Sequence, residues 1–178
     1  VEKMGGNISV RSEEERGSVF RVEVALEATE APSGSDDAHS ENGQQVSLAS
    51  LRVLAAEDNA TNRIVLGALL KPMGVEPAFA KNGRQAVEMF RQETFDVILM
   101  DVMMPEMSGP EATQAIRGLE SNSDLEPIPI YALTANLMRE QVTQYLECGM
   151  DGALGKPIDV EDLRRTLEGV ALAKSDAQ

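Results

Sequence analysis

The chain is poor in cysteine and in aromatic residues. Of its 178 residues only Cys148 is a cysteine, and tryptophan is absent. A single cysteine excludes an internal disulfide, which favours a reducing compartment. Aromatic residues make up 3% of the sequence, so the core must be built from aliphatic side chains, with methionine as a filler. We predict that Cys148 serves core packing, because it lies on the apolar face of a predicted helix.

Positive charge and long hydrophobic runs are also scarce. The chain has 16 Lys and Arg against 30 Asp and Glu, a net charge of −14. Without a basic stripe to neutralise phosphates, we expect no nucleic-acid binding, whereas a cation or a basic protein surface suits this charge. No run approaches the roughly 20 apolar residues of a membrane helix. We therefore expect no direct membrane contact by this chain and a cytoplasmic location, with membrane anchoring of a longer parent protein left open.

Short apolar strands alternate with amphipathic helices from residue 51 onward. This alternation predicts βα units and a parallel sheet. The strands are expected within 51–59, 75–80, 95–101, 128–134 and 153–157, and the first, fourth and fifth helices are expected to be capped by Asn59, Asn136 and Asp159. The side chains of these three helices that are predicted to face the core are Ile64, Ala68, Leu69, Met138, Val142, Tyr145, Leu146, Leu163, Leu167 and Val170.

The first 50 residues have a different composition. Residues 1–26 alternate apolar and polar side chains on either side of a polar turn, which predicts a β-hairpin. Residues 27–50 are small, polar and acidic, so we interpret them as a flexible linker; His39 lies there and is expected to be solvated. The remaining boundaries are a domain at 51–173 and a tail at 174–178.

Polar side chains stand where the predicted strands end. Glu57 and Asp58 follow the first strand, Asp101 ends the third, Thr134 ends the fourth, and Lys156 ends the fifth. The carboxyl ends of parallel strands meet at one edge of the sheet, where ligands bind. Three carboxylates should thus lie beside a hydroxyl and an ammonium. Because clustered carboxylates repel, at least one needs a proton or a cation, and Mg²⁺ suits hard oxygen ligands.

Several motifs carry a family resemblance: Glu57-Asp58-Asn59, Asp101 with Met104-Pro105 and Gly109, Ala132-Leu133-Thr134-Ala135, Gly149-Met150-Asp151, and Lys156-Pro157. Through them residues 51 to about 172 resemble a response-regulator receiver domain of the kind attached to hybrid sensor histidine kinases. The resemblance implies a doubly wound, flavodoxin-like α/β fold with a five-stranded parallel sheet. Residues 1–26 resemble the last two strands of a histidine-kinase ATP-binding domain, by Met4-Gly5-Gly6-Asn7-Ile8 and Gly17-Ser18-Val19-Phe20.

The resemblance also implies roles for individual residues. Asp101 would be the phosphoacceptor, Lys156 a fixed positive charge, and Thr134 a hydroxyl donor to the phosphoryl group. Mg²⁺ would be bound by Asp58, Asp101 and the backbone carbonyl of Met103, with Glu57 acting closely or through water. The Lys156-Pro157 peptide is expected to be cis.

The same resemblance implies partners and a reaction. The phosphoryl donor would be the histidine-bearing dimerisation domain of the same kinase, and the acceptor a histidine phosphotransfer protein. The fragment itself would catalyse only its own aspartyl phosphorylation and dephosphorylation.

Two positions bear on alternative functions. Ala153 stands where the family usually has an aromatic residue, which leaves the coupling of the Thr134 hydroxyl to ring burial in doubt. It keeps open a receiver-like docking module that regulates the kinase without phosphorylation. Met103 stands where aspartyl-phosphate hydrolases usually have a second acid, which disfavours a dedicated Mg²⁺-dependent phosphatase.

Overall fold

The structure, a computed structural model, describes residues 7–13, 17–23, 47–123 and 126–176. The chain divides into two compact units, Val1–Gly43 and Gln44–Gln178. In the first unit, β1 (Asn7–Glu13) and β2 (Gly17–Glu23) pair antiparallel, as the predicted hairpin requires. Its likeness to a kinase ATP-binding domain stays a prediction. The centre of the predicted turn, most of the predicted linker and His39 lie outside the described residues.

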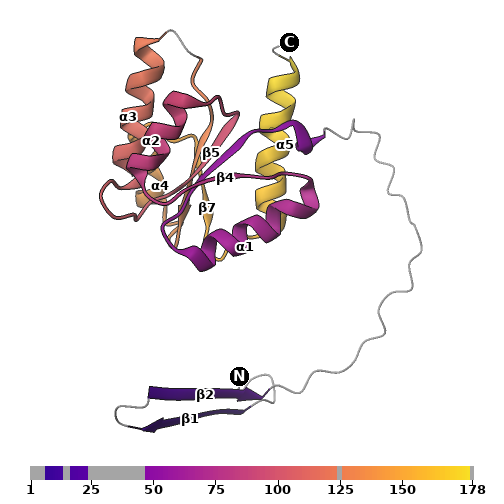
Figure 1. Ribbon diagram of the computed structural model, residues 1–178, viewed down its shortest axis with the longest axis vertical. Helices are drawn as coiled ribbons and strands as arrows, with labels where there is room; N and C mark the ends of the chain where they lie inside the picture. The colour runs from indigo at the N-terminus through magenta and orange to yellow at the C-terminus, as the bar shows by residue number, and fades with distance from the viewer. Residues whose placement is uncertain (1–6, 14–16, 24–46, 124–125, 177–178) are drawn as a thin grey trace, which may run out of the picture. The chain divides into compact units, whose positions relative to one another are not determined.

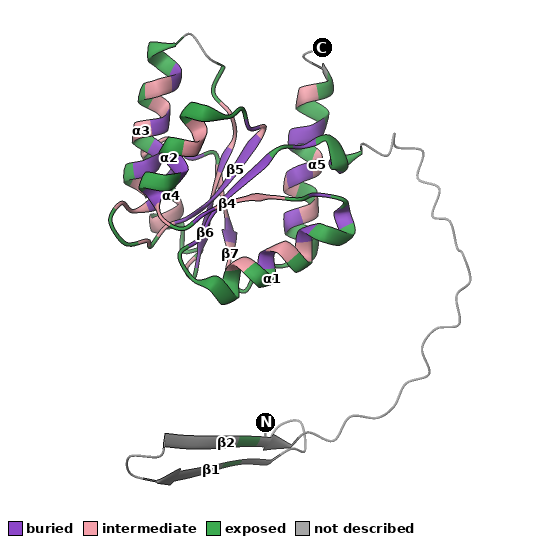
Figure 2. Ribbon diagram, viewed as in Figure 1, coloured by how far each residue is buried: buried purple, intermediate pink, exposed green. Residues whose placement is uncertain are grey.

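The second unit is built on a parallel sheet of five strands in the order β4-β3-β5-β6-β7. This order confirms the predicted flavodoxin-like, doubly wound fold. The central strands β3 and β5 are buried along their whole length, whereas the edge strand β4 is only partly buried (Figure 2). The strands are β3 (Val53–Ala56), β4 (Ala78–Ala80), β5 (Val97–Asp101), β6 (Ile130–Thr134) and β7 (Gly152–Gly155).

Helices cover both faces of this sheet (Figure 1). One core layer joins α1 (Ala60–Leu70) and α5 (Val160–Asp176) to the sheet, through leucines such as Leu66 and Leu163. The other layer packs α2 (Gly83–Gln92), α3 (Gly109–Asn122) and α4 (Arg139–Glu147) on the opposite face. Because both faces are covered, the strands read as continuous apolar runs. Two short 3-10 turns, Leu48–Ser50 and Lys71–Met73, complete the unit.

The predicted inner face of α1 is wrong in part. Ile64 is 73% exposed and Ala68 is exposed, while Leu66 and Leu70 are buried and Leu69 is half-buried. This helix carries apolar residues on nearly every side, so its sequence alone does not define a single inward stripe. Packing against α5 and the sheet selects the face.

The prediction for α4 is also wrong in part. Tyr145 is buried and Val142 half-buried, as predicted, but Met138 and Leu146 are 67% and 49% exposed. The helix begins at Arg139 rather than after Asn136. The Asn136 side chain instead accepts a hydrogen bond from the Met138 backbone N–H at 2.9 Å, which closes a local turn before the helix. The predicted caps Asn59 and Asp159 do accept backbone hydrogen bonds at the starts of α1 and α5.

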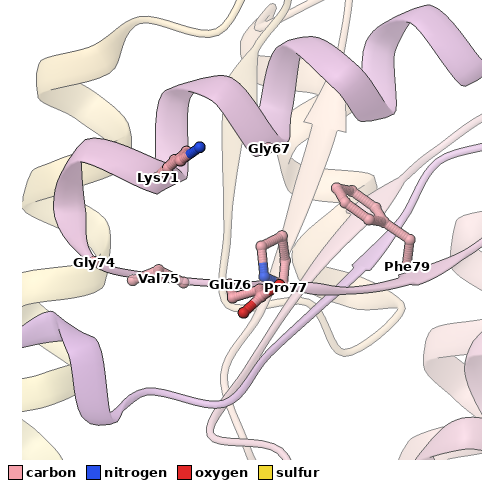
Figure 3. A pocket seen from close by; sticks show the side chains of 7 residues that line it. All are labelled: Gly67, Lys71, Gly74, Val75, Glu76, Pro77 and Phe79. Atoms are coloured by element: carbon pink, nitrogen blue, oxygen red, sulfur yellow. The ribbon is translucent and has the colours of Figure 1, made fainter.

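The strand predicted at 75–80 is shortened to Ala78–Ala80. Proline at position 77 has no N–H to donate to a ladder, and Val75 is buried without pairing in the sheet. A shallow hollow lies beside this segment, between the end of α1 and the edge strand, and Lys71, Pro77 and Phe79 line part of it (Figure 3).

The packed unit reaches past both ends of the predicted 51–173 domain. Leu48, which falls in the predicted linker, is 6% exposed and belongs to the core. At the other end α5 continues to Asp176, and Lys174, the first residue of the predicted tail, places its Nζ 2.9 Å from Asp96 Oδ2. The described residues contain no helix of the length and apolarity that crossing a bilayer requires.

Asp96 binds Arg52, just before β3, and Lys174, near the end of α5. Its removal should therefore lower the free energy of unfolding. Its side chain, 8% exposed, accepts hydrogen bonds from Arg52 at 2.8 and 3.0 Å and pairs with Lys174. Burial alone would raise the pKa of Asp96. The hydrogen bonds from Arg52, together with the hydrogen bond and the positive charge of Lys174, instead lower it to about 2. Because the pKa of Asp96 is lower in the folded state, its ionised side chain stabilises the fold at pH values above the unfolded-state pKa of about 3.9. This stabilisation is lost as the pH falls toward 2.

Asp96→Asn should therefore lower the free energy of unfolding by about 2 kcal/mol at pH 7, and the difference from the wild type should shrink as pH falls from 4 toward 2. Urea unfolding at a series of pH values measures this. Asp162→Asn is the matched control, because Asp162 pairs with Arg165 on the surface with both side chains more than half exposed. An equal loss for the two variants at pH 7 would contradict the prediction.

Candidate functional site

Three carboxylates meet at the carboxyl edge of the two central strands. Glu57 and Asp58 directly follow β3, and Asp101 is the last residue of β5. One oxygen from each lies within 4.8 Å of the others. Glu57 and Asp101 are 1% and 6% exposed, whereas Asp58 is exposed. The structure thus brings together three of the predicted residues, with one acid open to solvent.

Lys156 joins the two buried acids. It follows β7, and its Nζ lies 2.6 Å from Glu57 Oε2 and 2.8 Å from Asp101 Oδ2. Its backbone N–H donates to the carbonyl of Thr134 at 2.7 Å, which holds the ends of β6 and β7 together. The Lys156-Pro157 bond is cis, as predicted.

Burial and the shared lysine shift the pKa values of this triad. Burial raises the pKa of Asp101, and the nearby charge of Glu57 adds to the rise against the opposing effect of Lys156. For Glu57, burial acts upward too, but hydrogen bonds from Lys156 and Asn62 lower its pKa overall. The pKa of Lys156 is raised, because its bonds to both carboxylates outweigh burial. The lysine therefore stays charged, and of the two buried acids Asp101 is the one whose pKa is raised overall.

Thr134 and Met103 complete the predicted set. Thr134 is 5% exposed at the end of β6, and its hydroxyl contacts the backbone of Asn136 at 3.2 Å and the Tyr145 hydroxyl at 3.1 Å. Met103 donates its backbone N–H to Asp101 Oδ1 at 3.3 Å, while its side chain is exposed. The Met103 carbonyl as a metal ligand stays a prediction.

Two residues of α1 support the acids and were missed in the sequence. Asn62 donates its side-chain amide to Glu57 Oε1 at 2.9 Å. Arg63 donates through Nη1 to the backbone carbonyls of Glu57 at 2.8 Å and Asp58 at 2.7 Å. Both lie in the first helical turn after the Asn59 cap, where side chains are near the preceding strand end. Their position in the first turn after a predicted strand end could have identified them from the sequence as candidate site residues.

Gly109 allows the loop after Asp101 to close tightly. A Cβ at Gly109 would lie 2.3 Å from the Asp101 carbonyl oxygen, a contact no side chain tolerates. Its N–H donates to the Val102 carbonyl at 3.0 Å. The start of α3 is thereby held against the end of β5, which fixes the backbone that carries Asp101.

The donor set fits a hard divalent cation. Carboxylate oxygens suit Mg²⁺, which binds few protein ligands and retains several waters. Both oxygens of Glu57 already accept hydrogen bonds, from Asn62 and from Lys156, whereas Asp58 is exposed. Asp58 is consequently better placed than Glu57 for direct ligation.

Fold and site together define an α/β domain with an acidic cluster at the switch point of a doubly wound sheet. Residues 53–168 match the family model of the response regulator receiver domain. The chain belongs to this family, as its motifs predicted. It is 35% identical over 163 residues to the aerobic respiration control sensor protein ArcB of Escherichia coli, covering 92% of this chain and 20% of ArcB.

Solved structures agree with this assignment. The receiver domain of sensor histidine kinase PA1611 from Pseudomonas aeruginosa, solved with magnesium in its active-site cleft, superposes with a TM-score of 0.61 at 34% identity, over 68% of this chain and 97% of that one. A chain from the complex of the Saccharomyces cerevisiae phosphotransfer protein Ypd1 with the Ssk1 receiver domain gives a TM-score of 0.67 at 29% identity, over 70% of this chain and 90% of that one. This chain spans only 14% to 20% of the length of the first curated relatives it matches.

Proposed function

We propose that this domain accepts a phosphoryl group from a phosphohistidine onto Asp101 in a phosphorelay. The observation that carries the proposal is the setting of the Asp101 carboxylate. It is buried at the end of a central strand, 2.8 Å from a lysine ammonium and within 4.8 Å of two further acids. A carboxylate is a weak nucleophile, but transfer of a phosphoryl group depends mainly on positioning and charge neutralisation.

In the proposed transfer, a carboxylate oxygen of Asp101 attacks the phosphorus of the phosphohistidine. A P–O bond forms and the P–N bond breaks, and the imidazole nitrogen leaves with the electron pair and takes a proton from water. Lys156 neutralises charge on the transferred group, because its ammonium already sits beside the attacking carboxylate. Thr134 donates its hydroxyl to a phosphoryl oxygen after transfer.

Mg²⁺ would be held by Asp58, Asp101 and the Met103 carbonyl, with Glu57 acting closely or through water. When bound, the ion neutralises the negative oxygens of the phosphoryl group. Glu57 pairs with Lys156 and so holds its ammonium beside Asp101.

The parent protein in this proposal is a hybrid sensor histidine kinase in the cytoplasm or anchored to a membrane. The donor is its own histidine-bearing domain, and the acceptor is a histidine phosphotransfer protein. The match to ArcB supports this context, since its 163 residues exceed those after residue 50 and so reach into the upstream segment. The Ssk1 complex with Ypd1 supports the acceptor.

The test is phosphorylation by a small donor. Incubation with Mg²⁺ and acetyl phosphate should add one phosphoryl group, measured by intact-protein mass. Asp101→Asn should take up none, and chelation of the metal should stop labelling of the wild type. Asp162→Asn, which changes a surface carboxylate, should label normally. Labelling of the Asp101→Asn variant at the wild-type rate would overturn the assignment, and regulation by docking alone would then be favoured.

A further inference from the structure

Tyr145 on α4 contacts the one hydroxyl that is proposed to respond to phosphorylation. Its hydroxyl lies 3.1 Å from Thr134 Oγ1 and donates to Gln141 Oε1 at 3.3 Å. Tyr145 and Thr134 are 7% and 5% exposed, so water has little access to either hydroxyl. A buried hydrogen bond therefore connects the end of β6 to the last turn of α4.

The residue at position 153 is small and lies in the core layer that contains Tyr145. Ala153 on β7 pairs with Ala132 on β6, and both belong to the core layer that contains Tyr145. Thr134 lies two residues after Ala132 and shares its face of the sheet. An aromatic side chain at 153 would compete for this layer, whereas alanine leaves it to a ring supplied by α4.

We infer that Tyr145 is a positioning residue through which the state of Asp101 reaches α4. The inference rests on the proposed function. The Thr134 hydroxyl has one proton, so when it donates to a phosphoryl oxygen it cannot also donate to Tyr145 or to the Asn136 carbonyl. A buried hydroxyl is rarely left without a partner. If Thr134 moves toward the phosphoryl group, Tyr145 either turns its proton to the Thr134 oxygen and follows it, or is left donating to Gln141 alone. Either response changes how α4 sits on the sheet.

The composition of the chain allows a direct optical readout. It has no tryptophan and two tyrosines, Tyr131 and Tyr145. In a Tyr131→Phe background, tyrosine emission comes from Tyr145 alone. Beryllofluoride with Mg²⁺, a mimic of the phosphoryl group, should change this emission severalfold more than Mg²⁺ alone. Thr134→Val in the same background should lose the response, and Thr134→Ser, which retains a hydroxyl, should restore it.

Amide resonances measured by NMR supply the second readout. In the wild type, beryllofluoride should shift the resonances around Asp101 and Lys156 and those of α4. In Tyr145→Phe the first group should still shift, while the α4 shifts should fall by at least half. Tyr131→Phe, which also removes one phenol oxygen, should respond like the wild type.

The outcomes separate this inference from the proposed function. If wild-type resonances around Asp101 do not move, the phosphoacceptor assignment fails and the coupling fails with it. If they move, and α4 of Tyr145→Phe responds as strongly as that of the wild type, only the coupling through Tyr145 is overturned. The coupling would also be overturned if the Thr134→Val variant kept the full change in Tyr145 emission on addition of beryllofluoride.

Discussion

Lys156→Met should slow phosphorylation of Asp101 by roughly 100-fold or more, the usual cost of losing one preorganised charge that stabilises a transition state. The same variant should bind Mg²⁺ more tightly, by at least about tenfold, because an ammonium no longer opposes a divalent cation at a few ångströms. Both effects follow from one ammonium that lies 2.6 Å from Glu57 and 2.8 Å from Asp101. Labelling with acetyl phosphate and titration calorimetry with MgCl₂ measure the two.

Phosphorylation and Mg²⁺ affinity are predicted to change in opposite directions, which distinguishes loss of the charge from a general loss of structure. Partial unfolding would weaken both labelling and metal binding, whereas loss of the charge separates them. Lys71→Met is the matched control, since Lys71 is exposed at the far end of α1 from the acids. It should leave both quantities unchanged. Mg²⁺ affinity equal to that of the wild type in Lys156→Met would show that the ammonium does not compete with the metal.

The residues at the strand ends could be predicted from the sequence because the carboxyl ends of all strands in a parallel sheet lie at the same edge. Once the strands are located, their terminal polar residues must share one edge, and Glu57, Asp101 and Lys156 are found in contact there. The spacing of apolar residues located α5 equally well, since Leu163 and Leu167 form a narrow stripe and both are buried.

Other features depend on contacts that no local pattern encodes. The face of α1 is decided by what packs on it, so the exposed Ile64 could not be told from the buried Leu66. Leu48 was assigned to the linker because the stretch before it is mostly small, polar and acidic, whereas in the structure it packs in the core. The contact of Tyr145 with Thr134 joins residues from a helix and a strand, and such a pairing depends on how the elements pack rather than on a local pattern.

The motif Gly149-Met150-Asp151 carried the family resemblance without a stated reason, and the structure supplies one. Arg117 on α3 donates to the Gly149 carbonyl at 2.9 Å and to Asp151 Oδ2 at 2.7 Å. It also donates to the Ile128 carbonyl at 2.9 Å and to Glu120 Oε2 at 2.8 Å. One guanidinium thus ties α3 to the segments that enter β6 and β7, at the edge of the sheet opposite the acids.

Arg117→Met should lower the free energy of unfolding by about 3 kcal/mol or more, as expected when one partner of a buried ion pair is removed. The Glu120 side chain is 2% exposed, and its second oxygen accepts the Ile128 N–H at 3.0 Å. Among the described residues Arg117 is the cation paired with it, so its charge would be left buried without one. Urea unfolding at pH 7 measures the loss. Adding Glu120→Gln should recover part of it, because the stranded charge is removed. Arg165→Met, which breaks a surface pair with Asp162, should change stability by no more than the measurement error; a comparable loss there, or no recovery in the double variant, would show that the buried charge is not the cause.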